Sequence, residues 1–233
     1  MGDSIRGIKR LAVRLGARRV AIAVAKGRGR HHSDWISFGL RRDLRAPFAA
    51  PQAAIPLSIR PLREDDVARL FDLDDPNLSA DERALRENRR AMARQRIKTG
   101  YVATNGDDEP CFVQWLLDAR ENERLRGYFK GIFPRLADDE ALLEGAFTSE
   151  PQRGKRIMPH GMATVAERGG ELGARWVVTF VADDNIASLK GCKRAGFSPY
   201  LRREERWRWF RRTLTFTPLP EGTPYPFDEA PST

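Results

Sequence analysis

The chain has 233 residues, of which 41% are apolar, and carries a formal net charge of +9. This length suits one domain with an appendage and allows a sizeable core. Its two cysteines, Cys111 and Cys192, form neither a disulfide framework nor a zinc spacing, and they favour a reducing, cytoplasmic compartment. Three histidines make no metal cluster, so no metal site is expected, and no apolar run is long enough to span a bilayer.

The positive charge is concentrated at the N-terminus. Residues 1–56 contain 12 Lys and Arg against 3 Asp and Glu, which accounts for the whole net charge of +9. Residues 57–233 contain 29 of each sign. Such asymmetry predicts an acidic partner for the first quarter of the chain, either nucleic acid, a membrane surface or an acidic protein.

The N-terminal extension, residues 1–56, contains three expected elements. Apolar residues from Ile5 to Leu15 recur at helical spacing between basic residues, which predicts a short basic amphipathic helix. This helix can dock on the protein itself, lie on a membrane or bind an acidic partner. Arg19–Ala25 and Asp34–Leu40 are expected to form a β-hairpin, and Arg45–Pro56 is interpreted as a linker.

The second domain, residues 57–216, is predicted to begin with a strand, Leu57–Pro61, and a short helix whose first turn is acidic. A long charged helix is expected over Ser79–Lys98, opened by a capping box between Ser79 and Glu82. The arginines of this helix, Arg89 among them, either meet an acidic acceptor or lie on a solvated face.

Two strands, Gly100–Thr104 and Cys111–Leu117, are expected on either side of a turn that begins Asn-Gly. The segment from Arg120 to Asp139 breaks the strand pattern and contains Gly127–Pro134, which is rich in aromatic residues. A loop of this length can flank a pocket, but its aromatic residues can equally cover the core.

The most informative stretch runs from Leu142 to Phe197. A strand, Leu142–Thr148, is followed by a basic loop, Pro151–Arg156, and by a helix that opens at Ile157 with Pro159 at a first helical position. A helix N-terminus after a glycine-containing basic turn is suited to binding phosphate. A solvated basic loop is the alternative interpretation.

A further strand, Trp176–Val181, precedes the segment Asp184–Ser188 and a helix that ends at Ala195–Gly196–Phe197. Leu201–Phe216 is expected to be a last strand region, in which residues 206–210 alternate basic and aromatic side chains. The tail, residues 217–233, contains four prolines within ten residues and is predicted to be extended or disordered.

The order of these motifs resembles the acyl-CoA-binding core of the GNAT N-acyltransferase superfamily. The resemblance covers about Leu57 to Trp209 and rests on Arg153–Gly154, Asn185–Ser188 and Gly196–Phe197. It implies an α/β fold of the α+β type, a central mixed β-sheet flanked by helices, with the basic N-terminal helix and hairpin as an extension.

The sequence departs from the family pattern at three positions. Pro151 stands where the family loop usually begins with Gln or Arg, and Arg156 replaces the usual second small residue. Cys192 occupies the position of a Tyr that often serves as the general acid.

The resemblance implies an N-acyltransferase that moves an acetyl or longer acyl group from acyl-CoA directly to a primary amine. By the same resemblance, the co-substrate is held by residues of the strand, the loop and the helix start, together with two residues of the Asn-containing segment: Phe147, Thr148, Arg153, Gly154, Lys155, Arg156, Ile157, Asn185 and Ser188. The acceptor type is not readable, and a homodimer is compatible with the pattern.

Two residues are candidates for proton transfer. Glu144 is the candidate general base, because a carboxylate on a strand near an apolar pocket has a raised pKa, although a structural ion pair is the alternative. Cys192 is the candidate donor to the leaving thiolate, or else a small buried core residue.

Two other functions fit the same sequence. The thioester donor can be an acyl carrier protein, whose acidic surface would suit the basic residues 1–56. Alternatively, the chain is a non-catalytic, basic nucleic-acid-binding protein on a GNAT-like scaffold, because fold alone does not fix function.

Overall fold

The structure is a computed structural model. It describes residues 32–76, 78–94 and 99–228. The expected N-terminal helix and the first strand of the expected hairpin lie outside the described residues, as do residues 95–98 of the second helix. The chain divides into two compact units, the larger formed by Arg41–Thr179 and Gly191–Phe197. Of the described residues, the smaller unit contains 32–40, 180–190 and 198–228.

The larger unit is built on a mixed sheet with the strand order β2-β3-β4-β5-β6. The strands are β2 (Ser58–Pro61), β3 (Gly100–Thr104), β4 (Pro110–Asp118), β5 (Glu140–Thr148) and β6 (Trp176–Ala182). Pairs from β2 to β5 are antiparallel, whereas β5 and β6 run parallel. The expected mixed sheet is therefore confirmed, and every strand predicted between residues 57 and 181 is present.

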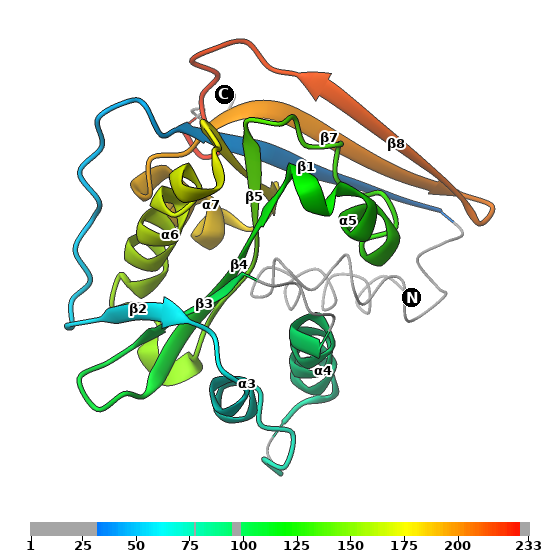
Figure 1. Ribbon diagram of the computed structural model, residues 1–233. Coiled ribbons are helices and arrows are strands. Elements are labelled where there is room, and N and C mark those ends of the chain that lie inside the picture. The colour runs from blue at the N-terminus through cyan, green and yellow to red at the C-terminus, as the bar shows by residue number, and fades with distance from the viewer. Residues whose placement is uncertain (1–31, 77, 95–98, 229–233) are drawn as a thin grey trace. The chain divides into compact units, whose positions relative to one another are not determined.

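The helices of the larger unit are α3 (Glu64–Leu70), α4 (Ala80–Arg94), α5 (Asn122–Tyr128) and α6 (Ile157–Glu167) (Figure 1). The α6 helix runs alongside β4 and β5 and is packed so closely that a Cβ at Gly161 would lie 2.7 Å from the Phe112 ring. The predicted capping box is confirmed, since the Glu82 amide donates to Ser79 Oγ and the Ser79 amide donates to Glu82 Oε2. Short 3₁₀ turns cover Ala119–Glu121, Glu150–Gln152 and Gly170–Leu172.

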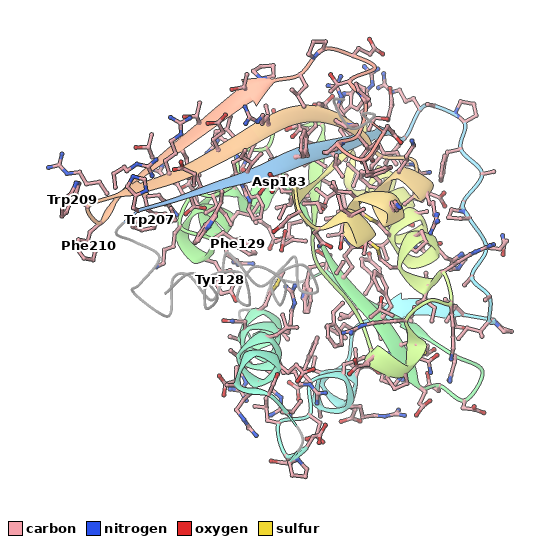
Figure 2. All side chains as sticks on the ribbon, turned by 180° about the vertical axis from the view of Figure 1, so that it is seen from behind. Tyr128, Phe129, Asp183, Trp207, Trp209 and Phe210 are labelled. Atoms are coloured by element: carbon pink, nitrogen blue, oxygen red, sulfur yellow. The ribbon has the colours of Figure 1, made fainter. Side chains whose placement is uncertain are left out.

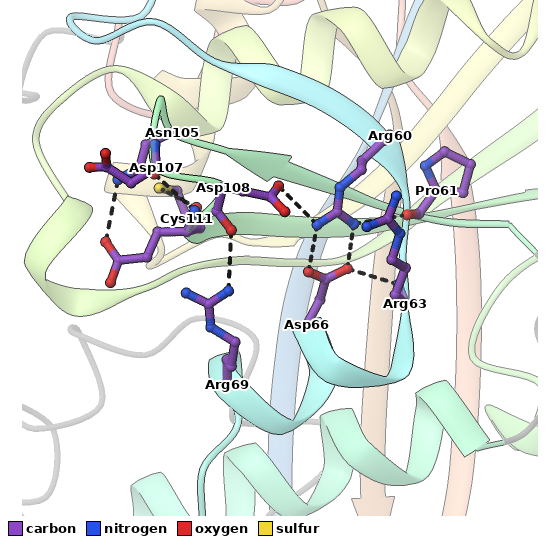
Figure 3. A network of polar contacts seen from close by, with 10 residues as sticks. Arg60, Pro61, Arg63, Asp66, Arg69, Asn105, Asp107, Asp108 and Cys111 are labelled. Atoms are coloured by element: carbon purple, nitrogen blue, oxygen red, sulfur yellow. Dashed lines mark hydrogen bonds and ion pairs between the residues drawn. The ribbon is translucent and has the colours of Figure 1, made fainter.

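A polar network joins β2, α3 and the β3–β4 loop at the edge of this sheet (Figure 3). Arg60 donates two hydrogen bonds to the carboxylate of Asp66, at 2.6 and 2.9 Å, and pairs with Asp108 at 3.2 Å. The Arg63 amide also donates to Asp66, which is only 2% exposed. Burial opposes ionisation, but these hydrogen bonds hold the pKa of Asp66 below its usual value.

The smaller unit contains β1 (His32–Asp43) as far as Leu40, together with β7 (Ser198–Arg208), β8 (Arg211–Pro218) and the end of β6. Its strand order is β6-β1-β7-β8, so β1 lies inside the sheet. The Asp183 amide donates to the Ile36 carbonyl, and Arg203 donates to Ser37 Oγ on β1. The α7 helix (Ile186–Arg194) begins in this unit and ends in the larger one.

The expected last strand region, Leu201–Phe216, is an antiparallel hairpin of two strands rather than one. Its loop has two residues, Trp209 and Phe210, and both have positive φ, 47° and 64°. This turn could not be predicted from the sequence, because paired positive φ angles usually require Asn and Gly. The tail described to residue 228 is partly ordered, since Tyr225 is 4% exposed and Leu219 donates to the Tyr200 carbonyl.

Within the part of the chain that the structure describes, no helix has both the length and the apolar character needed to cross a membrane. The domain boundaries expected at residues 56 and 216 remain predictions.

Candidate active site

The basic loop and the start of α6 form a turn whose backbone is suited to anion binding. Gly154 has φ +83°, and Arg156, the N-cap residue of α6, has φ +57° with no side-chain cap. The first N–H groups of a helix have no intrahelical partner, so this uncapped terminus offers donors to a ligand. Pro159 is the third helical residue rather than the first, but its missing N–H still falls among those unpaired positions.

Three cations surround this helix terminus. Arg153, Gly154 and Arg156 are exposed, while Lys155 is half-buried. Lys155 Nζ donates to Gln152 Oε1 at 2.7 Å, and Arg153 pairs with Glu150 at 3.5 Å. Both contacts are with neighbours in the same loop, so the side chains of Arg153 and Lys155 stay within that loop.

The segment expected to be a linker holds the loop in place. It has no regular secondary structure, but the Ala54 amide donates to the Lys155 carbonyl at 2.8 Å. His160 Nδ1 lies 2.9 Å from the Pro51 carbonyl oxygen, and Ile55 packs against the buried cluster that contains Ile157. The shape of the loop therefore depends on residues about one hundred positions earlier in the chain.

A β-bulge on β5 places Glu144. Trp115 pairs with Glu144 and Val113 with Phe147, so one residue of β4 lies opposite two residues of β5. Gly145, the first of those two, has φ +76°, and a Cβ there would lie 2.7 Å from the Trp115 ring. Because directly paired residues share a face, the bulge puts Glu144 and Phe147 on one face, although they are three positions apart.

Arg89 of α4 lies beside this bulge. Its side chain is 8% exposed, its Nη1 would lie 3.1 Å from a Cβ at Gly145, and its Nε has no hydrogen-bond partner. Burial lowers the pKa of Arg89, and the charge of Glu144 opposes this shift. A solvated face of α4 was one interpretation of its arginines, and for Arg89 that interpretation is wrong.

Tyr128, at the end of α5, lies close enough to Arg89 and Glu144 for their charges to affect its pKa. Burial raises the pKa of its phenol, while the charge of Arg89 lowers it and that of Glu144 raises it. Tyr128 stacks edge-on against Phe129, which in turn contacts Phe133, with ring centroids 4.8 and 5.0 Å apart. All three rings are half-buried. In Figure 2 Tyr128 and Phe129 lie next to each other beyond the end of α5.

The strand residues predicted to flank the co-substrate lie at the end of β5. Phe147 packs on Phe71, with ring centroids 5.1 Å apart, and Thr148 pairs with Phe112. Both are half-buried, whereas Ile157 at the start of α6 is buried in the core. Glu144, Phe147, Thr148 and the loop from Arg153 to Ile157 therefore all belong to the larger unit.

Asn185 and Ser188 belong to the smaller unit and bond to each other. Asn185 Nδ2 donates to Ser188 Oγ at 2.7 Å, and the Ser188 amide donates to Asn185 Oδ1 at 3.3 Å. This is the geometry of an N-cap for α7, which gives the Asn-containing motif a structural role. Their predicted contact with a co-substrate stays a prediction.

Cys192 lies in the core of the larger unit. It is fully buried, its thiol contacts Met162 Sδ at 3.7 Å, and burial raises its pKa to about 12. Both features count against the predicted transfer of a proton from Cys192, which stays a prediction. Among the described residues, no group of His, Cys, Asp and Glu is arranged to hold a metal ion.

The comparison with protein-family models identifies the family. The model for an acetyltransferase (GNAT) domain matches residues 57–198, which is more than half of the chain. The chain therefore belongs to the GNAT acetyltransferase family. A search of curated proteins returned no match.

A solved structure with a TM-score above 0.5 supports the fold. The glucosamine N-acetyltransferase region of a fungal multi-domain β-N-acetylglucosaminidase has a TM-score of 0.54 at 12% identity, covering 85% of this chain and 23% of that one. A GNAT acetyltransferase from Colwellia psychrerythraea has a TM-score of 0.49 at 14% identity, with coverages of 78% and 59%. A GCN5-related N-acetyltransferase from Sphaerobacter thermophilus has 0.48 at 14%, with coverages of 80% and 56%. The chain thus spans less than two thirds of these proteins.

Proposed function

We propose that this protein transfers an acetyl or longer acyl group from acyl-CoA to a primary amine by direct attack of the amine on the thioester. One observation carries the proposal. The strand that bears Glu144 is followed by a loop with three cations and then by the uncapped N-terminus of α6. A phosphate-binding loop and a carboxylate base are the two parts that such a reaction requires.

The loop residues fit the diphosphate of CoA. Backbone N–H groups at the start of α6 and the side chains of Arg153, Lys155 and Arg156 supply donors and positive charge to one anion. Parallel pairing of β5 with β6 covers Glu140 to Leu142, and the backbone of Phe147 and Thr148 further along β5 is proposed to contact a pantetheine arm. Asn185 and Ser188 are proposed to contact the same arm.

Glu144 is proposed to take the proton that the amine must lose. Only a neutral amine attacks a carbonyl carbon, so the base must lie close to the nucleophile. The new amide bond forms as the carbon–sulfur bond breaks, and the released thiolate gains one proton. Arg89 is proposed to position Glu144 and to favour its ionised form, because an adjacent positive charge stabilises a carboxylate.

The source of the thiolate's proton can be tested at Cys192. A Cys192→Ser variant keeps nearly the same volume and removes the thiol. If Cys192 donates the proton, release of CoA should fall about a hundredfold or more while the melting temperature changes little. Unchanged release would remove Cys192 from the mechanism and leave it as a core residue.

The donor is tested by the melting temperature with acetyl-CoA, longer acyl-CoAs or CoA. A ligand that binds the folded protein raises this temperature by mass action. The increase should be lost in a variant with Arg153, Lys155 and Arg156 changed to Gln. It should persist in the matched control, Arg124→Gln with Arg135→Gln, which removes two exposed arginines of the same unit. No increase with any of these compounds would refute the proposal.

A second donor remains a candidate because of the charge distribution. Residues 1–56 carry the whole net charge of +9, which would suit an acidic acyl carrier protein. In that case acyl-CoA would raise the melting temperature weakly, and an acylated carrier would bind with an affinity that falls steeply as salt is added.

A further inference from the structure

The tip of the β7–β8 hairpin exposes two large aromatic side chains. Trp209 is 77% exposed and Phe210 is 60% exposed. Figure 2 shows both pointing away from the end of the hairpin, with Trp207 set back from the tip. Exposed Trp and Phe side chains cost solubility, so a pair of them at one point calls for an explanation.

The backbone conformation of this tip is a second unusual feature. Trp209 and Phe210 both have positive φ, and a bulky residue in that region is an outlier in folded proteins. Asn and Gly would form the same two-residue turn without strain. Backbone strain of this kind is often associated with function.

Arginines surround the two aromatic residues. Arg206, Arg208, Arg211 and Arg212 all lie within three residues of the turn, and no acidic residue occurs between positions 206 and 212. Arg206 pairs with Glu204 at 2.7 Å and Arg208 with Asp34 at 2.6 Å, while Arg211 on β8 is exposed. Two exposed apolar side chains with arginines beside them are complementary to an anionic surface that has an apolar interior.

We propose that the Trp209–Phe210 tip binds the interface of an anionic phospholipid membrane. Trp is enriched at the level of the lipid headgroups, and basic residues are attracted to the negative leaflet. Stable attachment needs two signals, which here are the two aromatic rings and the arginines beside the turn. This proposal does not rest on the identity of the acyl donor or acceptor.

The geometry favours a membrane over a macromolecular partner. A stable protein interface takes about 20–30 residues from each partner, whereas this apolar surface consists of two side chains on a narrow ribbon. Single-stranded nucleic acid is bound in a basic groove whose aromatic residues stack successive bases, whereas this tip is convex. A convex tip can enter a fluid interface that needs no matching shape.

The test is sedimentation of the full chain with vesicles of phosphatidylcholine alone or with about 30% phosphatidylserine, near physiological salt. The double variant Trp209→Asn with Phe210→Gly removes both rings and installs a favourable turn, so it should fold at least as well as the parent. We expect the parent to bind the anionic vesicles at least tenfold more tightly than the double variant, and to bind neutral vesicles weakly. Lipids brominated near the headgroup should quench part of the parent's tryptophan fluorescence.

A separate variant tests the charge. Arg211→Gln leaves both rings in place and should weaken binding to anionic vesicles severalfold, with a smaller dependence on salt. Equal binding by the parent and the Asn-Gly variant would overturn the proposal. Equal sedimentation with neutral and anionic vesicles would also overturn it. The same holds if the protein binds a single-stranded oligonucleotide but no vesicles.

Discussion

Two of the arginine–carboxylate arrangements in the larger unit differ in how fully their hydrogen-bonding groups are satisfied. Arg60 donates two hydrogen bonds to Asp66, which also accepts from a backbone amide (Figure 3). Arg89 lies beside Glu144 at a bulge, and its Nε lacks a hydrogen-bond partner. A satisfied buried network fixes the elements that it joins, whereas an unsatisfied cation costs stability. The difference supports a structural role for the first arrangement and agrees with the functional role proposed for the second.

The largest expected effect is on activity at Glu144. Changing Glu144→Gln should lower kcat/KM by about 10² to 10⁴, because a positioned base contributes a factor of that size. The free energy of unfolding should change by less than about 1 kcal/mol. Steady-state release of CoA and urea unfolding measure the two quantities.

The control for this variant is Glu123→Gln, which neutralises an exposed glutamate paired with Arg135 in the same unit. It should leave both activity and stability unchanged. If Glu144→Gln loses stability but keeps its rate, then Glu144 belongs with the structural pair, and the proposed contrast is wrong.

Asp66→Asn should have the opposite profile. It leaves the guanidinium of Arg60 without its principal anion, and breaking a buried pair costs about 3–5 kcal/mol. We expect a fall of roughly 3 kcal/mol in the free energy of unfolding, measured in urea. The rate per folded molecule should be retained at low temperature, and a specific loss of rate would place this network in the active site.

The same carboxylate predicts how stability depends on pH. Because the pKa of Asp66 is lower in the folded protein than its reference value of 3.8, its contribution is complete above that value. As the pH falls below about 4, the unfolded chain binds the proton first, and the contribution is lost. Asp66→Asn should remove this part of the dependence, which acid unfolding followed by circular dichroism would show.

The elements of the domain could be predicted from the sequence because their signals are local. The strand before the basic loop, the helix from Ile157 and the Ser79–Glu82 capping box each depend on residues close together in the chain. Periodicity and capping chemistry are enough to find such features.

The geometry of the site could not be predicted, because it depends on contacts between distant residues. The bulge that moves Glu144 and Phe147 to one face follows from the packing of Gly145 against Trp115. The burial of Arg89 follows from how α4 packs, and its sequence neighbourhood is that of a charged surface helix. The position of β1 inside the sheet of the smaller unit likewise has no local signal.

Arg89→Met tests the positioning role with a smaller expected effect. Removing the cation should make ionisation of Glu144 less favourable, since an adjacent positive charge stabilises a carboxylate. The acid limb of the kcat/KM profile should therefore move to higher pH. Stability should change by less than about 1 kcal/mol, because replacing a buried, incompletely satisfied cation by an apolar residue is often neutral.

Asp108→Asn is expected to have the smallest effect and sharpens the comparison most directly. Asp108 pairs with the same Arg60 as Asp66 does, at 3.2 Å, but its side chain is 66% exposed. Exposed pairs contribute about 0–1 kcal/mol, so the free energy of unfolding should fall by about 0.5 kcal/mol. Both asparagine variants replace a carboxylate that pairs with Arg60. The two carboxylates differ mainly in burial and in the number of hydrogen bonds they accept. If Asp108→Asn cost as much as Asp66→Asn, burial would not explain the strength of this network, and the distinction from the Arg89 site would lose its physical basis.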